Sequence, residues 1–177
     1  MSDVLTIALL ASIVVQKPLV GVRKIHPSPS ANIQAANFTV TVTPPTISFN
    51  ATNPGVSPVV AGSSASNVSW NVISGGNNWS LRVQASTPTF TGCPSIPISA
   101  VTVSCSAASV GSLGGSATCA APFQLSTAEA QVAGGSEGAI AYNYSVTVSF
   151  TLADSWKYVA KTTPACTLSL TYTADVP

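Results

Sequence analysis

The stretch Ile140–Leu152, which reads IAYNYSVTVSFTL, alternates apolar and polar residues. Its even positions hold Ile, Tyr, Tyr, Val, Val, Phe and Leu, and its odd positions from residue 143 hold Asn, Ser, Thr, Ser and Thr. Successive side chains of a strand point to opposite faces, so this period of two predicts a strand with one apolar face and one hydroxyl-rich face. The many Val and Thr residues favour strands because β-branched side chains suit a pleated surface.

The same period recurs along the chain from Asn37 onward. Strands are expected at residues 37–43, 47–49, 68–72, 79–83, 98–103 and 166–173. The residues Gly75-Gly76-Asn77-Asn78 predict a hairpin-like turn between the two strands that flank them. Seven or more short strands favour an all-β fold, an immunoglobulin-like antiparallel β-sandwich over residues 37–177. Residues 126–132 have room for at most one helical turn, because Gly134 and Gly135 follow.

The N-terminal residues 1–36 differ from the rest and are predicted to be an export signal or membrane anchor followed by a linker. Val4–Val15 is a short apolar run of the length of a signal-peptide core, although no positive charge precedes it. Pro18, Pro27 and Pro29 mark the linker. The alternative is a hydrophobic strand or helix that the mature protein keeps.

The composition excludes some classes of partner. The chain has 177 residues, of which 46% are hydrophobic and 6% charged, and its formal net charge is +1. Nucleic acid is not an expected partner, because its recognition requires clustered Lys and Arg. A neutral, hydroxyl-rich surface favours association. The expected partners are copies of the same chain, a cell-wall polymer or a glycan.

The four cysteines predict two disulfides in an oxidising compartment. No Cys-x-x-Cys pair occurs, and the single histidine, His26, lies in the predicted linker, so neither a metal site nor a cofactor is expected. Three pairings are possible, and we favour Cys105–Cys119, which brackets a Gly/Ser-rich loop, together with Cys93–Cys166. Four reduced, buried thiols are the alternative.

Five Asn-x-Ser/Thr sequons are candidate glycosylation sites in a host that glycosylates surface proteins. They begin at Asn37, Asn50, Asn67, Asn78 and Asn143.

No catalytic residues are predicted. His26 lies outside the predicted domain, which therefore lacks a histidine to act as a base. Glu129 and Glu137 could form a carboxylate pair, but both flank Gly-rich sequence and are expected in a solvated loop. Trp70 and Trp79 could form a sugar-stacking platform, but their phase with Val and Leu favours a place in the core.

A family resemblance is carried by Ser69–Val72, Gly75-Gly76 and Asn78–Val83. This arrangement resembles the WxL-type domains of bacterial surface proteins, with Trp79-Ser80-Leu81 at the position of the motif. Residues 90–103 resemble the middle of that family, and residues 138–152 and 167–173 resemble its paired closing strands. The resemblance implies non-covalent binding to cell-wall polymer, although four cysteines and a low charge differ from the usual family pattern. The composition also resembles that of secreted β-sandwich subunits of prokaryotic surface filaments.

Two functions follow as expectations for a non-enzymatic protein at the cell surface. The first is a self-assembling subunit of a filament or layer, in which the strand Asn37–Thr43, with Phe38, Val40 and Val42 on one face, pairs with a neighbouring copy. Pro44-Pro45 would act as its hinge, and the alternative is an ordinary first strand of its own domain. The second function is a monomeric wall- or glycan-binding adhesion module of WxL-like type. A carbohydrate-active enzyme is a third, less favoured class.

Overall fold

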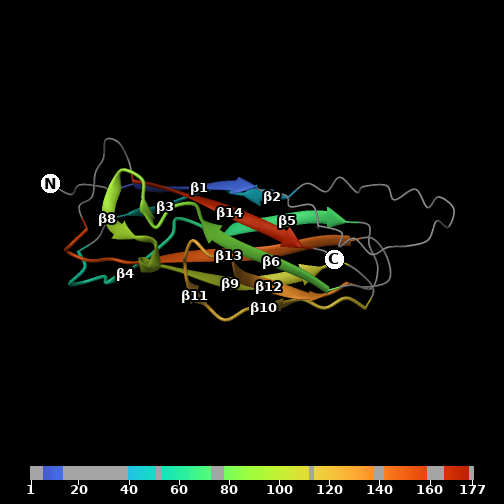
Figure 1. Cartoon of the computed structure of the whole chain (residues 1–177). Helices are drawn as coiled ribbons and strands as arrows, with labels where there is room; N and C mark the ends of the chain where they lie inside the picture. The colour runs from blue at the N-terminus through green and yellow to red at the C-terminus, as the bar shows by residue number, and fades with distance from the viewer. Residues whose placement is uncertain are drawn as a thin grey trace, which may run out of the picture.

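The computed structural model describes residues 6–13, 40–50, 53–72, 78–111, 114–137, 142–158 and 166–175. These residues form an all-β fold with one short 3₁₀ turn, η1 (Ile98–Ala100), and no α-helix (Figure 1). The strands are β1 (Thr6–Ile13), β2 (Thr41–Thr43), β3 (Thr46–Asn50), β4 (Val59–Ala61), β5 (Ser66–Val72), β6 (Asn78–Ala85), β7 (Thr89–Phe90), β8 (Cys93–Pro97), β9 (Val101–Val110), β10 (Thr118–Cys119), β11 (Phe123–Gln124), β12 (Ala130–Ser136), β13 (Tyr142–Ala153) and β14 (Thr167–Asp175).

Two large sheets contain most of these strands. The first sheet has the order β10-β12-β6-β14-β1-β3, and the second has the order β11-β9-β13-β5-β2, with β4 pairing the far end of β13. A separate hairpin is formed by β7 and β8. The described strand pairs are antiparallel except β1–β14, which is parallel.

The core lies between the two large sheets and follows the predicted alternation. In β13 the side chains of Tyr144, Val146, Val148, Phe150 and Leu152 are buried, and the polar residues between them are half-buried or exposed. The first sheet contributes its inner residues to the same cluster, from β6 (Trp79, Leu81, Val83) and β14 (Leu168, Leu170, Tyr172). The strands predicted at 47–49, 68–72, 79–83 and 166–173 are confirmed, as is the described part of 140–152. Of the predicted strand 98–103 only the second half is strand, because Ile98–Ala100 forms η1, and residues 37–39 of the predicted strand 37–43 lie outside the described residues.

The pairing of the strands differs from the sequence-based prediction at two places. The predicted hairpin around Gly75-Gly76 is wrong, because β5 pairs with β2 and β13 in one sheet, and β6 pairs with β12 and β14 in the other. The expected pairing of the two closing strands is also wrong, since β13 and β14 belong to different sheets. In both cases a turn or an alternating pattern is local, whereas the choice of sheet depends on distant partners.

The apolar N-terminal run also has a place in the fold. Thr6–Ile13 forms β1, which lies between β14 and β3 in the first sheet, so the first and last strands of the chain are neighbours (Figure 1). The export or anchor role of residues 1–36 stays a prediction. The rest of that segment lies outside the described residues.

Candidate functional site

The two tryptophans considered as a sugar platform lie in the core. Trp79 on β6 is 2% exposed, and its indole meets Trp70 and Tyr144 of the opposite sheet edge to face, with ring centroids 5.7 and 5.4 Å apart. Trp70 stacks on Tyr144 at 5.1 Å. Edge-to-face and stacked pairs add stability beyond the area that they bury. The WxL-like motif residues Trp79 and Leu81 are thus part of the interface between the two sheets.

The Gly-rich segment beside this cluster was predicted as a loop, and that prediction is wrong. Gly134 and Gly135 belong to β12, which pairs with β6. The Trp79 indole Nε1 donates a hydrogen bond to the Ser116 carbonyl oxygen at 3.0 Å. A β-carbon on Gly135 would overlap that same oxygen, so glycine is needed for the close approach of the two backbones.

Glu137 was expected in solvent but is 5% exposed. Its Oε1 accepts a hydrogen bond of 2.7 Å from the Tyr144 hydroxyl, while its Oε2 and the Trp70 Nε1 are buried without a hydrogen-bond partner. A buried acceptor left without a partner costs about 1–3 kcal/mol, and the bond from the Tyr144 hydroxyl satisfies only one of the two carboxylate oxygens.

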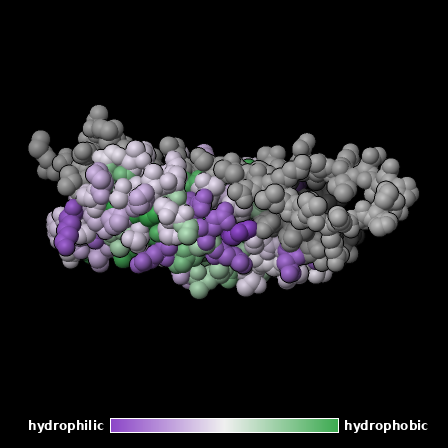
Figure 2. All heavy atoms as spheres, in the orientation of Figure 1, coloured by the Kyte–Doolittle hydropathy of each residue, from purple (hydrophilic) through white to green (hydrophobic). Residues whose placement is uncertain are grey.

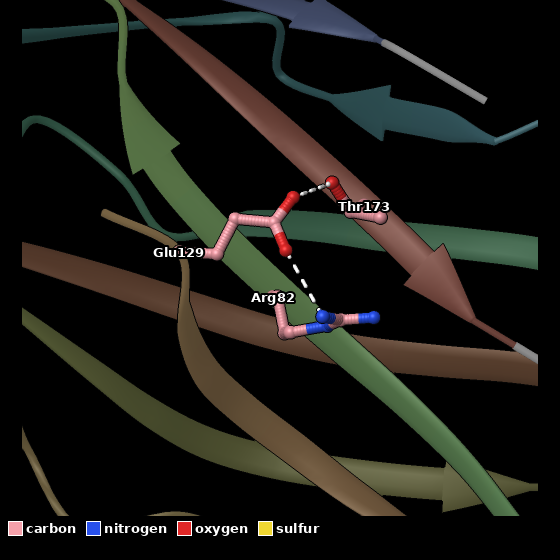
Figure 3. A network of polar contacts seen from close by, with 3 residues as sticks. All are labelled: Arg82, Glu129 and Thr173. Atoms are coloured by element: carbon pink, nitrogen blue, oxygen red, sulfur yellow. Dashed lines mark hydrogen bonds and ion pairs between the residues drawn. The ribbon is translucent and has the colours of Figure 1, made fainter. Parts of the chain in front are cut away.

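The other carboxylate of the considered pair, Glu129, lies in a separate polar network on the first sheet (Figure 3). Its Oε2 accepts from Arg82 Nη1 at 3.0 Å, and its Oε1 accepts from Thr173 Oγ1 at 2.8 Å. The network joins β6, β14 and the residue just before β12. Glu129 and Glu137 have no hydrogen-bond partner in common in these contacts.

The disulfides have the favoured pairing. Cys105 on β9 bonds to Cys119 on β10, and this bond links the two large sheets. Cys93 on β8 bonds to Cys166, the residue before β14. The Gly/Ser-rich segment inside the shorter loop is only partly a loop, because β9 continues to Val110.

The sequons differ in exposure. Asn50, Asn78 and Asn143 are exposed, whereas Asn67 is half-buried and its Nδ2 donates to Ser145 Oγ at 2.7 Å. Asn37 lies outside the described residues. Glycosylation at each position stays a prediction.

The predicted assembly strand is partly described. Thr41–Thr43 forms β2, which pairs with β5 of the same chain at the edge of the second sheet, and Val40 and Val42 are buried in the core. Phe38 lies outside the described residues.

An exposed apolar tip was missed by the sequence-based reasoning. We use this name for Val56, Val59 and Trp156, whose side chains are 79%, 58% and 75% exposed. Asp154 N donates to the Pro58 carbonyl at 2.8 Å. This bond joins the segment that contains Val56 and Val59 to the segment that contains Trp156. Tyr158 N donates to the Ser155 carbonyl and closes a turn around Trp156. The Asp-Ser-Trp-Lys sequence at residues 154–157 has no alternation, which was the available signal that Trp156 is not a core residue.

The charged side chains are few in the part of the chain that the structure describes. They are Arg82, Glu129, Glu137, Asp154, Lys157 and Asp175. Arg82 and Glu129 neutralise each other, and Glu137 is buried. The coloured part of the visible face combines pale areas with separate purple, hydrophilic areas and green, hydrophobic ones (Figure 2).

Within the described ranges no group of three His, Cys, Asp or Glu side chains gathers as a metal site requires. The same residues include no helix that is long and apolar enough to cross a membrane.

Comparisons of the chain with models of protein families, with curated proteins and with solved structures found no match.

Proposed function

We propose that this protein is a non-enzymatic extracellular structural subunit that assembles with copies of itself into a filament or layer at the cell surface. In this proposal the two sheets are an immunoglobulin-like β-sandwich, and strands at the sheet edges make the contacts between copies. The export of the chain is part of the same proposal.

The observation that carries the proposal is the absence of charge on the edge strands. The described strands at the ends of the two sheets, β2, β3, β10 and β11, contain no Asp, Glu, Lys or Arg. Edge strands present unpaired backbone N–H and C=O groups, and soluble monomers protect such edges with charged residues, lysine above all, or by keeping the strand very short. Because β2, β10 and β11 have only two or three residues, the five-residue strand β3 is the uncharged edge that offers a neighbour the longest pairing. A surface with few charges also gives little repulsion between copies.

The two disulfides support an oxidising, extracellular setting. Disulfides persist outside the cytoplasm and are rare within it. The Cys105–Cys119 bond links the two large sheets, so it would help the sandwich to keep its shape when neighbours attach.

Electron microscopy and light scattering of the oxidised protein test the proposal. We expect assemblies that grow with protein concentration, and a double substitution of exposed residues on β3, Thr46→Lys with Asn50→Lys, should reduce them. The matched control places two lysines on β13, which is paired on both sides by β5 and β9, Asn143→Lys with Thr147→Lys. Monodisperse particles of monomer mass at every concentration would contradict the proposal.

The exposed apolar tip favours a second candidate function, a glycan-binding adhesion module of the kind that the WxL resemblance implies. An exposed indole can stack on a sugar ring, and Trp156 is the exposed tryptophan in the described residues. Because Trp79 and Leu81 are buried, residues outside the WxL-like motif would have to bind the polymer.

Titration with cell-wall polysaccharide tests this second function. Trp156→Ala should abolish a binding signal that Trp156→Phe partly keeps, with the unfolding midpoint unchanged in both. A signal that is equal in the wild type and Trp156→Ala would exclude the tip as a glycan site.

A further inference from the structure

The strand β1 occupies a slot whose two walls are β14 and β3. It runs parallel to β14 from Ala8 to Ile13 and antiparallel to β3 from Thr6 to Leu10. Neighbouring strands lie about 4.7–4.9 Å apart, so without β1 a gap of one strand width separates two rows of unpaired backbone groups.

The register of β1 matches its sequence to the buried face of the slot. Odd-numbered positions of β1 are partners of buried residues in the two walls: Ile7 with Phe49, Leu9 with Ile47 and Leu168, Ala11 with Leu170, and Ile13 with Tyr172. Of the even positions, Thr6, Ala8 and Ser12 are the partners of exposed or half-buried residues. A slip by one residue would exchange these two sets, so the slot selects this segment in this register.

The connection to the rest of the chain is long enough for β1 to reach another molecule. Residues 14–39 separate β1 from Val40 and span at most roughly 90 Å when extended. By comparison, the twelve-residue strand β13 is about 40 Å long. The strand β2 lacks this freedom, because only Pro44 and Pro45 join it to β3 in the other sheet.

We propose that β1 of one copy occupies the β3–β14 slot of the next copy in the assembly. This inference rests on the proposed self-assembly and transfers its contact from β2, where the sequence placed it, to β1. The occupant is a second copy of this chain, and the contact is head to tail, so it propagates unless a ring closes. The backbone pairs are the same within one chain and between chains, and protein concentration therefore decides between the two states. A linker that joins a strand to its own slot gives an effective concentration on the order of millimolar, so exchange is expected when the chain folds near that concentration.

Cross-linking between two single-cysteine variants tests the exchange. Ser12→Cys and Thr171→Cys are register partners on neighbouring strands, at a spacing that suits a disulfide. All four native cysteines are already bonded, so the introduced thiols are the ones that react. The two variants are unfolded together with their native disulfides intact, refolded at concentrations up to about 1 mM, the effective concentration given above, and then mildly oxidised.

We expect disulfide-linked heterodimers in this mixture, increasing with concentration. The control mixture of Ser12→Cys with Ser149→Cys, which lies on β13 of the other sheet, should give few. Adding Leu9→Pro to the Ser12→Cys chain should remove the link, because proline cannot donate within an interior strand.

The double variant Ser12→Cys/Thr171→Cys makes the negative outcome decisive. If it links within one chain while the mixture gives no heterodimer, β1 stays in its own slot and the proposal is wrong. If even the double variant does not link, β1 does not fill the slot, and the proposal is equally wrong. Filaments that form without cross-links would contradict the exchange of β1 but not the proposed structural function. Cross-linked closed dimers without larger assemblies would support the exchange and contradict the proposed filament or layer.

Discussion

Replacing Trp79 by alanine is the most direct test of the core that joins the two sheets. The indole is 2% exposed, contacts Trp70 and Tyr144 of the opposite sheet, and donates to the Ser116 carbonyl. The substitution removes all three contacts and leaves a cavity between the sheets.

The expected loss of stability follows from these contacts. Large aromatic residues in a core cost about 3–5 kcal/mol when truncated to alanine. Trp79→Phe keeps an aromatic ring but removes the indole donor and its hydrogen bond to the Ser116 oxygen. Ser116 is an exposed residue, so only the net value of one hydrogen bond, about 0.5–1.5 kcal/mol, is lost with the donor, and this variant should fall between the wild type and Trp79→Ala.

Urea unfolding of the oxidised protein, followed by circular dichroism, measures both variants. Trp156→Ala is the matched control, because its indole is 75% exposed and its loss should change the free energy of unfolding by less than about 0.5 kcal/mol. A free energy within 1 kcal/mol of the wild type for Trp79→Ala would refute the packing argument and return Trp79 to the surface.

Three further predictions concern covalent links, backbone packing and pH. Reduction of both disulfides should add four hydrogens to the intact mass, and alkylation of the unreduced native protein should find no thiol; four reactive thiols would contradict the pairing. Gly135→Ala should lower the unfolding midpoint, because the new methyl group meets the Ser116 backbone, whereas Gly111→Ala makes ordinary contacts and should not; equal midpoints would contradict the close approach. Burial raises the pKa of Tyr172 above its ordinary 10, so the unfolded chain loses this proton first and stability should fall as the pH rises above 10. Unfolding free energies measured from pH 8 to 11 should decline less in Tyr172→Phe, and an identical decline would contradict this cause.

The strands could be predicted from sequence because their signal is local. Alternation in β13 and β14 identifies the buried face from the residues of one strand alone. The sheet to which a strand belongs is not a local property. β5 pairs along its whole length with β13, 70 to 82 residues later in the chain, and a Gly-rich sequence next to β5 carries no information about that partner.

The errors at the candidate sites have specific physical causes. Gly134 and Gly135 resemble a loop because glycine weakens strands, yet the approach of the Ser116 backbone requires glycine there. That misassignment also placed Glu137 in solvent, although Tyr144 binds it within the core. Trp156 was missed for a different reason. It is exposed at a turn, and a turn has no periodic pattern from which its position could be predicted.

The N-terminal run shows how one composition can satisfy two different requirements. The core of an export signal needs apolar residues but no particular order. A strand in the β3–β14 slot needs order as well, and Thr6, Ala8 and Ser12 fall at the positions whose partners are exposed or half-buried. Leu10 is the exception, paired with Thr46 and Ser169 on the outer side. The alternation therefore favours a strand that stays with the folded protein, and the same order that seats it in its own slot makes it an equally good fit for the slot of another copy.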